Sequence, residues 1–171
     1  MVGGAAVATY TGGEYGTHDT DFIADLEGQE YEVVKQLGYI KINKNCFNNE
    51  LDSLIEFPTG PLAGNRDRVY EYIVDTTGYP IYLISIEDLI LDRIDAFDAT
   101  NDHNSREWAL RMMVVMYAHM EWSYLHSESH RRKTFPITEK IQKEAKRLIR
   151  HYNHIVQEQA VTSDMKQMKL H

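Results

Sequence analysis

Two glycines near the N-terminus, followed by two aspartates one residue apart, constrain this chain more than any other feature. Gly3 and Gly4 precede a short helix-forming run, and Asp19 and Asp21 flank Thr20. Glycine lets backbone N–H groups come close to a bound group such as a phosphate. Alternate residues of a strand share a face, so both carboxylates point the same way. Paired carboxylates repel unless a cation neutralises them, which predicts a metal site that handles phosphates.

The composition limits the class of protein. The chain has 171 residues, a net charge of -8 and a single cysteine, Cys46. One cysteine excludes an intramolecular disulfide, and no apolar run reaches the roughly 20 residues of a membrane-spanning helix. We therefore expect a cytoplasmic protein with no membrane partner. The negative charge argues against a large nucleic-acid surface but allows a local basic patch.

The first half of the chain mixes helical and strand patterns. Glycines at 12, 13 and 16 indicate a loop, and glycine and prolines at 58–61 end a strand. We expect helices over 5–10 and 29–37, and strands over 19–26, 39–43, 51–57, 69–74 and 81–83.

After residue 84 the pattern becomes almost entirely helical. Ser85, Ser105 and Thr138 are candidate N-caps, since a hydroxyl can accept a hydrogen bond from a first-turn N–H group. We expect helices over 86–99, 105–127 and 137–160. The fold class is then α+β, a mixed β-sheet flanked by helices with a C-terminal helical cap. The division is a 1–84 core and an 85–171 cap, packed as one compact unit.

A third carboxylate on a neighbouring strand would complete a metal site. In the expected strand over 51–57, Glu56 and Asp52 share one face, and Phe57 belongs to the other. Phe57 is best buried, which leaves Glu56 to join Asp19 and Asp21. Asp52 is the alternative, at the entrance of the strand.

The order of these motifs resembles that of the minimal nucleotidyltransferases of the DNA polymerase β superfamily. That family has an apolar residue before Gly-Gly or Gly-Ser, then Asp-apolar-Asp-apolar, then an acid on a later strand. The matching segments are Val2-Gly3-Gly4, Asp19-Thr20-Asp21-Phe22 and Glu56.

A bacterial subgroup of that superfamily, nucleotidyltransferase-like or antitoxin-like, is more similar still. The resemblance covers residues 2–112 and implies a polymerase β-like nucleotidyltransferase fold. It rests on stretches similar to Val2-Gly3-Gly4-Ala5-Ala6 with Tyr10-Thr11-Gly12-Gly13, to Ile55-Glu56-Phe57-Pro58-Thr59-Gly60-Pro61-Leu62, and to Asp88-Leu89-Ile90-Leu91-Asp92-Arg93-Ile94-Asp95-Ala96-Phe97.

The resemblance implies transfer of a nucleoside monophosphate from a nucleoside triphosphate (NTP) to a hydroxyl acceptor, with Mg²⁺ or Mn²⁺. Its catalytic and metal-binding residues would be Asp19, Asp21 and Glu56. Gly3 and Gly4 would contact the triphosphate, with Thr17 as a hydroxyl donor near it. Arg93 either faces this cleft or forms a structural ion pair with Asp92.

Two functions remain open on the sequence. One is an enzyme whose acceptor is a protein, an RNA end or a small molecule. The other is a catalytically silent, antitoxin-like binding module. We also expect a homodimer. A basic stripe of Lys143, Lys146, Arg147 and Arg150 is either a solvated helix face or a surface for RNA or an acidic partner.

Overall fold

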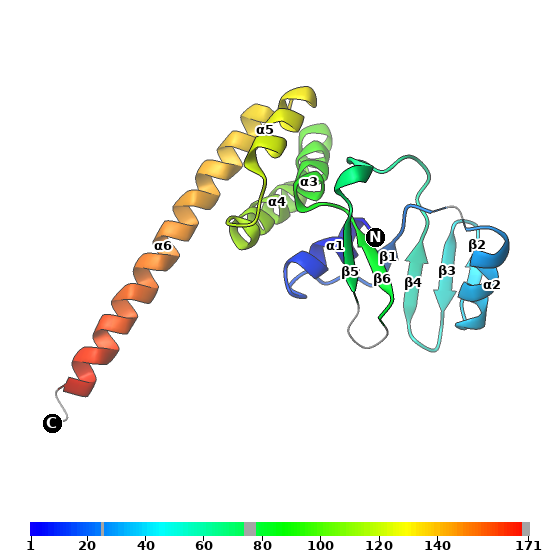
Figure 1. The fold of residues 1–171 in the computed structure, drawn as a ribbon, viewed down its shortest axis with the longest axis horizontal. Helices are drawn as coiled ribbons and strands as arrows, with labels where there is room; N and C mark the ends of the chain where they lie inside the picture. The colour runs from blue at the N-terminus through cyan, green and yellow to red at the C-terminus, as the bar shows by residue number, and fades with distance from the viewer. Residues whose placement is uncertain (25, 74–77, 169–171) are drawn as a thin grey trace.

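The computed structural model describes the backbone of residues 1–24, 26–73 and 78–168, and the side chains as far as residue 154. It has a mixed four-stranded sheet, a two-stranded sheet and six α-helices in this part of the chain. The sheets belong to the first half, and the second half is helical (Figure 1). The expected α+β class with a mixed sheet is therefore confirmed.

The mixed sheet places the strands in the order β1-β4-β3-β2. Strand β1 (Asp19–Asp21) pairs in parallel with β4 (Ser53–Glu56), and Asp21 lies opposite Glu56. Strand β3 (Asn45–Asn48) runs antiparallel to β4 and to β2 (Ile40–Ile42). Because paired residues point to the same face, this register determines which side chains can meet.

Two strand predictions need correction. The strand expected over 19–26 ends at Asp21, which also pairs with Val2 in an isolated bridge. Residue 25 is outside the described residues. The strand β3 had not been predicted at all. The strands expected over 39–43 and 51–57 are present in shorter form.

The second sheet is a hairpin of β5 (Tyr70–Ile73) and β6 (Pro80–Leu83). It lies beside the four-stranded sheet but shares no ladder with it (Figure 1). Residue 74 of the expected strand over 69–74 is outside the described residues. The short 3₁₀ helix η1 (Arg66–Arg68) precedes the hairpin.

Helices make up the remainder of the described chain. Helix α1 (Gly3–Tyr10) and helix α2 (Gly28–Gln36) belong to the sheet half. The helical half has α3 (Ile86–Thr100), α4 (His103–Met116), α5 (Trp122–Arg131) and α6 (Phe135–Met168). The last helix is long, and its C-terminal half extends away from the other elements (Figure 1).

The helix expected over 105–127 is wrong, because the chain turns between α4 and α5. Glu121 N–H donates to Glu87 (2.7 Å), and the Trp122 indole donates to the carbonyl of Tyr117 (3.2 Å). One long-range contact and one local contact thus accompany the end of one helix and the start of the next, without a glycine or a proline. Residues 117–121 therefore form a connection.

Only one of the three expected N-caps is correct. Ser85 accepts the N–H of Asp88 at the start of α3. At α4 the cap is Asp102, and Ser105 donates its hydroxyl to Asp102 (2.6 Å). At α6 the helix already begins at residue 135, and Thr138 donates its hydroxyl to a carbonyl one turn earlier (3.1 Å).

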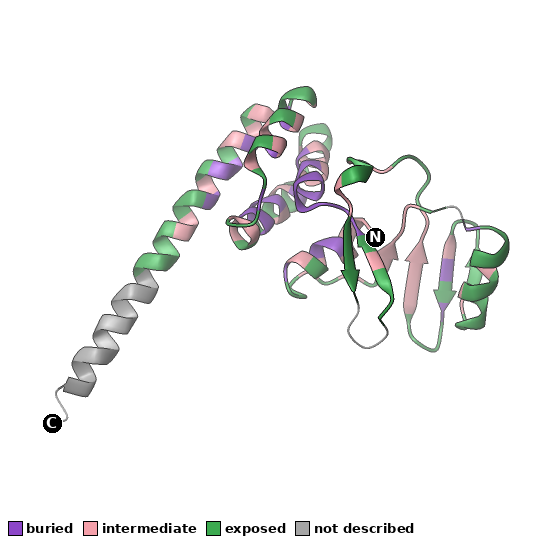
Figure 2. Ribbon diagram, in the orientation of Figure 1, coloured by how far each residue is buried: buried purple, intermediate pink, exposed green. Residues whose placement is uncertain are grey.

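The main hydrophobic core lies in the helical half and includes α1 (Figure 2). Ala6 and Val7 of α1 are fully buried against it. Its other members come from the end of β6, from α3 to α6 and from the connections before α3 and α5: Leu83, Ile84, Ile86, Leu89, Ile90, Leu91, Ile94, Ala109, Leu110, Met112, Met113, Met120, Leu125, Ile141 and Ala145. The division of the chain at residue 84 stays a prediction.

No helix of the described residues combines the length and apolar content needed to cross a bilayer.

Candidate metal site

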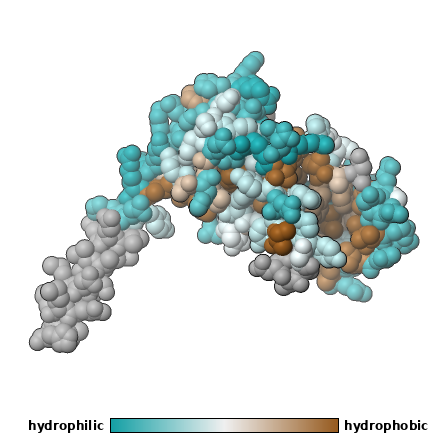
Figure 3. All heavy atoms as spheres, viewed as in Figure 1, coloured by the Kyte–Doolittle hydropathy of each residue, from teal (hydrophilic) through white to brown (hydrophobic). Residues whose placement is uncertain are grey.

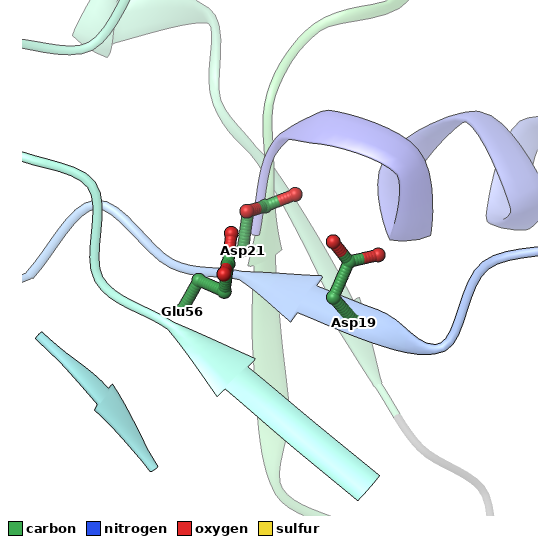
Figure 4. A group of neighbouring side chains, drawn as sticks. All are labelled: Asp19, Asp21 and Glu56. Carbon is green, nitrogen blue, oxygen red and sulfur yellow. The ribbon is translucent and has the colours of Figure 1, made fainter. Parts of the chain in front are cut away.

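Three carboxylates from two neighbouring strands meet on one face of the sheet. Asp19 and Asp21 are on β1, and Glu56 ends β4 directly opposite Asp21. One carboxylate oxygen of each lies within 4.8 Å of the other two. Figure 4 shows the side chains on the same side of the strands, with Asp21 next to the first turn of α1. The predicted convergence of these three acids is confirmed.

Glu56, and not Asp52, is the third acid. Asp52 lies in the turn before β4 with a φ of +46°, and it is exposed. Glu56 is half-buried, as are Asp19 and Asp21. The strand alternation from which Glu56 was predicted therefore holds as far as the end of β4.

The electrostatics of the cluster are those of crowded like charges. Burial raises the pKa of Asp21, and the neighbouring Asp19 and Glu56 carboxylates raise it further. A hydrogen bond from the Gly4 backbone N–H and the positive charge of Arg93 act in the opposite direction. A cation placed among the three acids would relieve this repulsion.

Gly3 and Gly4 make room for the acids. Gly3 has a φ of +61°, and a Cβ on it would overlap the Asp21 carboxylate. A Cβ on Gly4 would lie 2.9 Å from the Tyr15 ring and 3.0 Å from the Thr17 hydroxyl. Both glycines are thus required by contacts within the chain, and the expected contact with a triphosphate stays a prediction.

Thr17 lies beside the first aspartate. Its hydroxyl donates to the carboxylate of Asp19 and lies 3.2 Å from the Asp19 carbonyl oxygen. The structure therefore places Thr17 next to the cluster, where it orients Asp19. The predicted donation to a phosphate stays a prediction.

Arg93 of α3 combines both sequence interpretations. Its guanidinium pairs with Asp92 (3.2 Å), and its charge lowers the pKa of Asp21. The side chain is 21% exposed, and its Nε is buried without a hydrogen-bond partner among the described residues. Arg93 therefore forms the ion pair with Asp92, and its positive charge also acts on Asp21 in the acid cluster.

The sequence interpretation missed Asn45. This first residue of β3 lies opposite Glu56 and donates from Nδ2 to Glu56 Oε1 (2.9 Å). The bond holds one carboxylate oxygen of Glu56 in place at the edge of the acid cluster. Only the register of β3, a strand that was not predicted, could have revealed it.

Two buried acids of α3 hold the segment that follows Glu56. Asp88 is 1% exposed and accepts hydrogen bonds from Asn65 N–H (3.0 Å) and the Tyr124 hydroxyl (2.9 Å). Glu87 is fully buried and pairs with Arg68 (3.3 Å). The loop between β4 and β5 is thereby tied to the helical half, which supports the end of the strand that carries Glu56.

The basic stripe on α6 is exposed, as both of its interpretations require. Lys143 pairs with Glu139 (3.0 Å), while Lys146, Arg147 and Arg150 lie on the surface. Its interaction with RNA or an acidic partner stays a prediction, as does the homodimer.

Comparison with known proteins adds no assignment. We found no significant match to a protein-family model, to a curated protein or to a solved structure.

Proposed function

We propose that the protein is a metal-dependent nucleotidyltransferase with a polymerase β-like fold, acting in the cytoplasm on an NTP and a hydroxyl acceptor. The observation that carries the proposal is the meeting of Asp19, Asp21 and Glu56 within 4.8 Å, next to the first turn of α1. The arrangement matches the order of motifs that the sequence shares with that superfamily.

The donor set fits Mg²⁺ or Mn²⁺. Both ions prefer carboxylate oxygens. Burial raises the pKa of Asp21, and the Asp19 and Glu56 carboxylates raise it further, a repulsion that a divalent ion would offset. Asp19, Asp21 and Glu56 would hold the ion. When bound, it would neutralise charge on the triphosphate and favour loss of a proton from the acceptor hydroxyl.

The residues of the chain have separate tasks in this reaction. The acceptor oxygen attacks the α-phosphorus, the new O–P bond forms, and the bond to the β-phosphate oxygen breaks to release pyrophosphate. Glu56, oriented by Asn45, accepts the hydroxyl proton or passes it to water. Arg93 adds positive charge on the α3 side, where the triphosphate is the expected anion.

A catalytically silent binding role is the second candidate. It is favoured by exposed hydrophobic side chains on the strands, among them Ile40, Ile42, Tyr70, Tyr72 and Tyr82. Such side chains are typical of a surface that a partner covers.

One experiment separates the two functions. Calorimetric titration with each of the four NTPs, with Mg²⁺ and with EDTA, should show metal-dependent binding that is lost in Glu56→Gln. Incubation of an α-³²P-labelled NTP with hydroxyl acceptors should then give a labelled product. Tight NTP binding without metal, or equal binding by Glu56→Gln, would refute the nucleotidyltransferase.

A further inference from the structure

The acid cluster occupies one side of a sheet face whose remainder is apolar. Paired residues of neighbouring strands share a face, so Asn45 of β3 lies on the same face as Glu56. The other strand residues of this face are hydrophobic, and together they form what we call the open apolar face: Ile40, Ile42, Phe47 and Leu54. Leu54 precedes Glu56 by two residues, so the open apolar face begins about 7 Å along β4 from the acids.

The open apolar face is exposed, whereas the opposite face of the sheet is buried around β3. Ile40 is 60% exposed, Ile42 56% and Phe47 37%. Cys46 alternates with Asn45 and Phe47 along β3, and it is fully buried on the opposite face. Hydrophobic residues are also visible at the surface of the strand half in the space-filling view (Figure 3). Exposed apolar side chains that lie together are typical of a surface that a partner covers.

No positive charge belongs to this face on the four strands, all of whose residues the structure describes. The charged strand residues of the face are Asp19, Asp21 and Glu56, and all of them are acids. Lys41, the single basic residue of these strands, lies on the opposite face together with Cys46, its partner in β3. Nucleic acids are bound largely through cations at their phosphates. The face therefore suits neither a nucleic-acid end nor another phosphorylated acceptor.

The order of the strands indicates from which side an acceptor reaches the acids. Val2 pairs with Asp21 on the edge of β1 away from β4, and α1 begins directly after it. In the proposed function the triphosphate lies on this side, next to the Gly4 N–H. The attacking and leaving oxygens of phosphoryl transfer lie roughly in line. The acceptor oxygen therefore approaches from the side of β4 and β3, which is the side of the open apolar face.

The exposure of this face favours a protein as its ligand. Small ligands are held in clefts that bury most of their surface. Ile40 and Ile42 are both more than half exposed, so they do not enclose a small molecule. A protein segment can instead cover several of these side chains at once and remove their apolar surface from water. The same segment can place a hydroxyl group at Glu56.

We infer that the open apolar face binds a protein segment in which a serine, threonine or tyrosine lies among apolar side chains, and that this hydroxyl is the acceptor of the nucleotide. The inference rests on the proposed function for the transfer, whereas binding of the segment does not depend on it. In the transfer, the hydroxyl oxygen forms the bond to the α-phosphorus, its proton goes to Glu56 or to water, and pyrophosphate leaves.

Peptide binding in EDTA tests the face without the metal. The probes are fluorescein-labelled peptides with one tyrosine among leucines and valines, and the control peptides have lysines or glutamates in place of the leucines and valines. Fluorescence anisotropy should show binding of the apolar peptide alone. Ile40→Ser with Ile42→Ser should weaken this binding by roughly tenfold or more, because apolar contacts are lost. The milder pair Ile40→Thr with Ile42→Thr should also weaken it, and serves if the serine pair does not fold.

A matched control variant locates the effect. Val115 of α4 is exposed to a similar extent, 53%, but lies in the helical half. Val115→Ser removes apolar surface there and should leave peptide binding unchanged. If Val115→Ser weakens binding as much as the Ile40 and Ile42 substitutions do, the peptide is not bound at the open apolar face and the inference is overturned.

Transfer of label from an α-³²P-labelled NTP with Mg²⁺ tests the role of the peptide as acceptor. The apolar tyrosine peptide should be labelled, and the same peptide with phenylalanine in place of tyrosine should not. The substitutions at Ile40 and Ile42 should raise KM for the peptide and leave NTP binding unchanged. Label on the chain itself, at a rate that rises with the square of the protein concentration, would identify a second copy of the chain as the protein that supplies the hydroxyl.

The inference is overturned if the apolar peptide binds no more tightly than the charged ones, or if an oligoadenylate is labelled and the peptide is not. It also fails if the substitutions at Ile40 and Ile42 leave peptide affinity unchanged. If the peptide binds but Asp21→Asn leaves NTP binding intact, the proposed function fails and the peptide-binding face stands. If NTP binding needs Asp21 and Mg²⁺ but the peptide does not bind, the proposed function stands and this inference fails.

Discussion

Replacing Asp21 with asparagine is expected to stabilise the metal-free protein and to abolish its response to Mg²⁺. The substitution keeps the size of the side chain and an oxygen that can accept the Gly4 N–H hydrogen bond. It removes one negative charge from a group of three whose oxygens lie within 4.8 Å. The fold therefore loses repulsion, while the metal loses a ligand.

The magnitude follows from Coulomb's law. At 4.8 Å, two unit charges repel by about 1 kcal/mol in a medium with the dielectric constant of water. Asp21 faces two such neighbours in a half-exposed site, so Asp21→Asn should raise the free energy of unfolding by about 1–2 kcal/mol at pH 7 without metal. For a chain of this size, each kcal/mol corresponds to roughly 2–4 °C in Tm.

The pH dependence has a definite sign. Burial and the two neighbouring acids raise the pKa of Asp21 above its value in the unfolded chain. The folded protein is then most favoured while Asp21 is protonated, and this contribution is lost as the pH rises from about 4 through the raised pKa. The gain in free energy of unfolding from Asp21→Asn should therefore be absent at low pH. It should grow as the pH rises through the raised pKa of Asp21 and stay constant at higher pH.

Thermal unfolding with and without Mg²⁺ measures both effects. At a Mg²⁺ concentration 100 times its Kd, the natural chain should gain about 2.7 kcal/mol and the variant should gain almost nothing. Asp98→Asn, the same change at an exposed position of α3, is the matched control and should respond to Mg²⁺ like the natural chain. The reasoning is refuted if Asp21→Asn is less stable than the natural chain without metal, or if Mg²⁺ stabilises both equally.

Three further predictions concern the surroundings of the site, and urea denaturation measures all of them. Gly3→Ala should lower the free energy of unfolding by about 2 kcal/mol or more, because it adds a Cβ at a φ of +61° and against the Asp21 carboxylate. Asp21→Ala should restore part of this stability, and strictly additive effects of the two substitutions would contradict the contact. Arg68→Ala should cost about 3 kcal/mol, since it leaves the buried Glu87 without its charge partner; an unchanged stability would show that the pair is not formed. Ile94 of α3 is fully buried, so Ile94→Ala should lower the free energy of unfolding by about 2–5 kcal/mol. A decrease below about 1 kcal/mol would contradict that burial.

The acids could be predicted from the sequence because strand alternation is a local rule. Asp19 and Asp21 are two residues apart, and burial of Phe57 on the opposite face leaves Glu56 to join them, while Asp52 lies at the entrance of the strand. The structure brings Asp19, Asp21 and Glu56 together and leaves Asp52 exposed, although Phe57 is only half-buried. The order of helices and strands in the first half of the chain was also visible, except for β3 and the short η1.

What could not be predicted depends on contacts between distant segments. The sequence of β3, Asn45–Asn48, has two asparagines and little strand propensity, and it is a strand because β2 and β4 pair with it on both sides. The break between α4 and α5 depends on Glu87, which is more than thirty residues from Glu121 in the chain. Asn45 escaped notice for the same reason, since its role exists only through its pairing with Glu56.

The position of α1 has a practical consequence for anyone who wishes to shorten this protein. Cutting the chain after residue 84 would keep all three acids but would strip Ala6 and Val7 of the helices that shield them from water. The same short helix begins at Gly3, which lies against the Asp21 carboxylate. Loss of packing on the apolar side of α1 would therefore also disturb the acids, which lie within two helical turns of it. A minimal version of the site would first need a redesigned α1 with a polar inner side, because the residue that contacts Asp21 and the residues buried in the core belong to the same short helix.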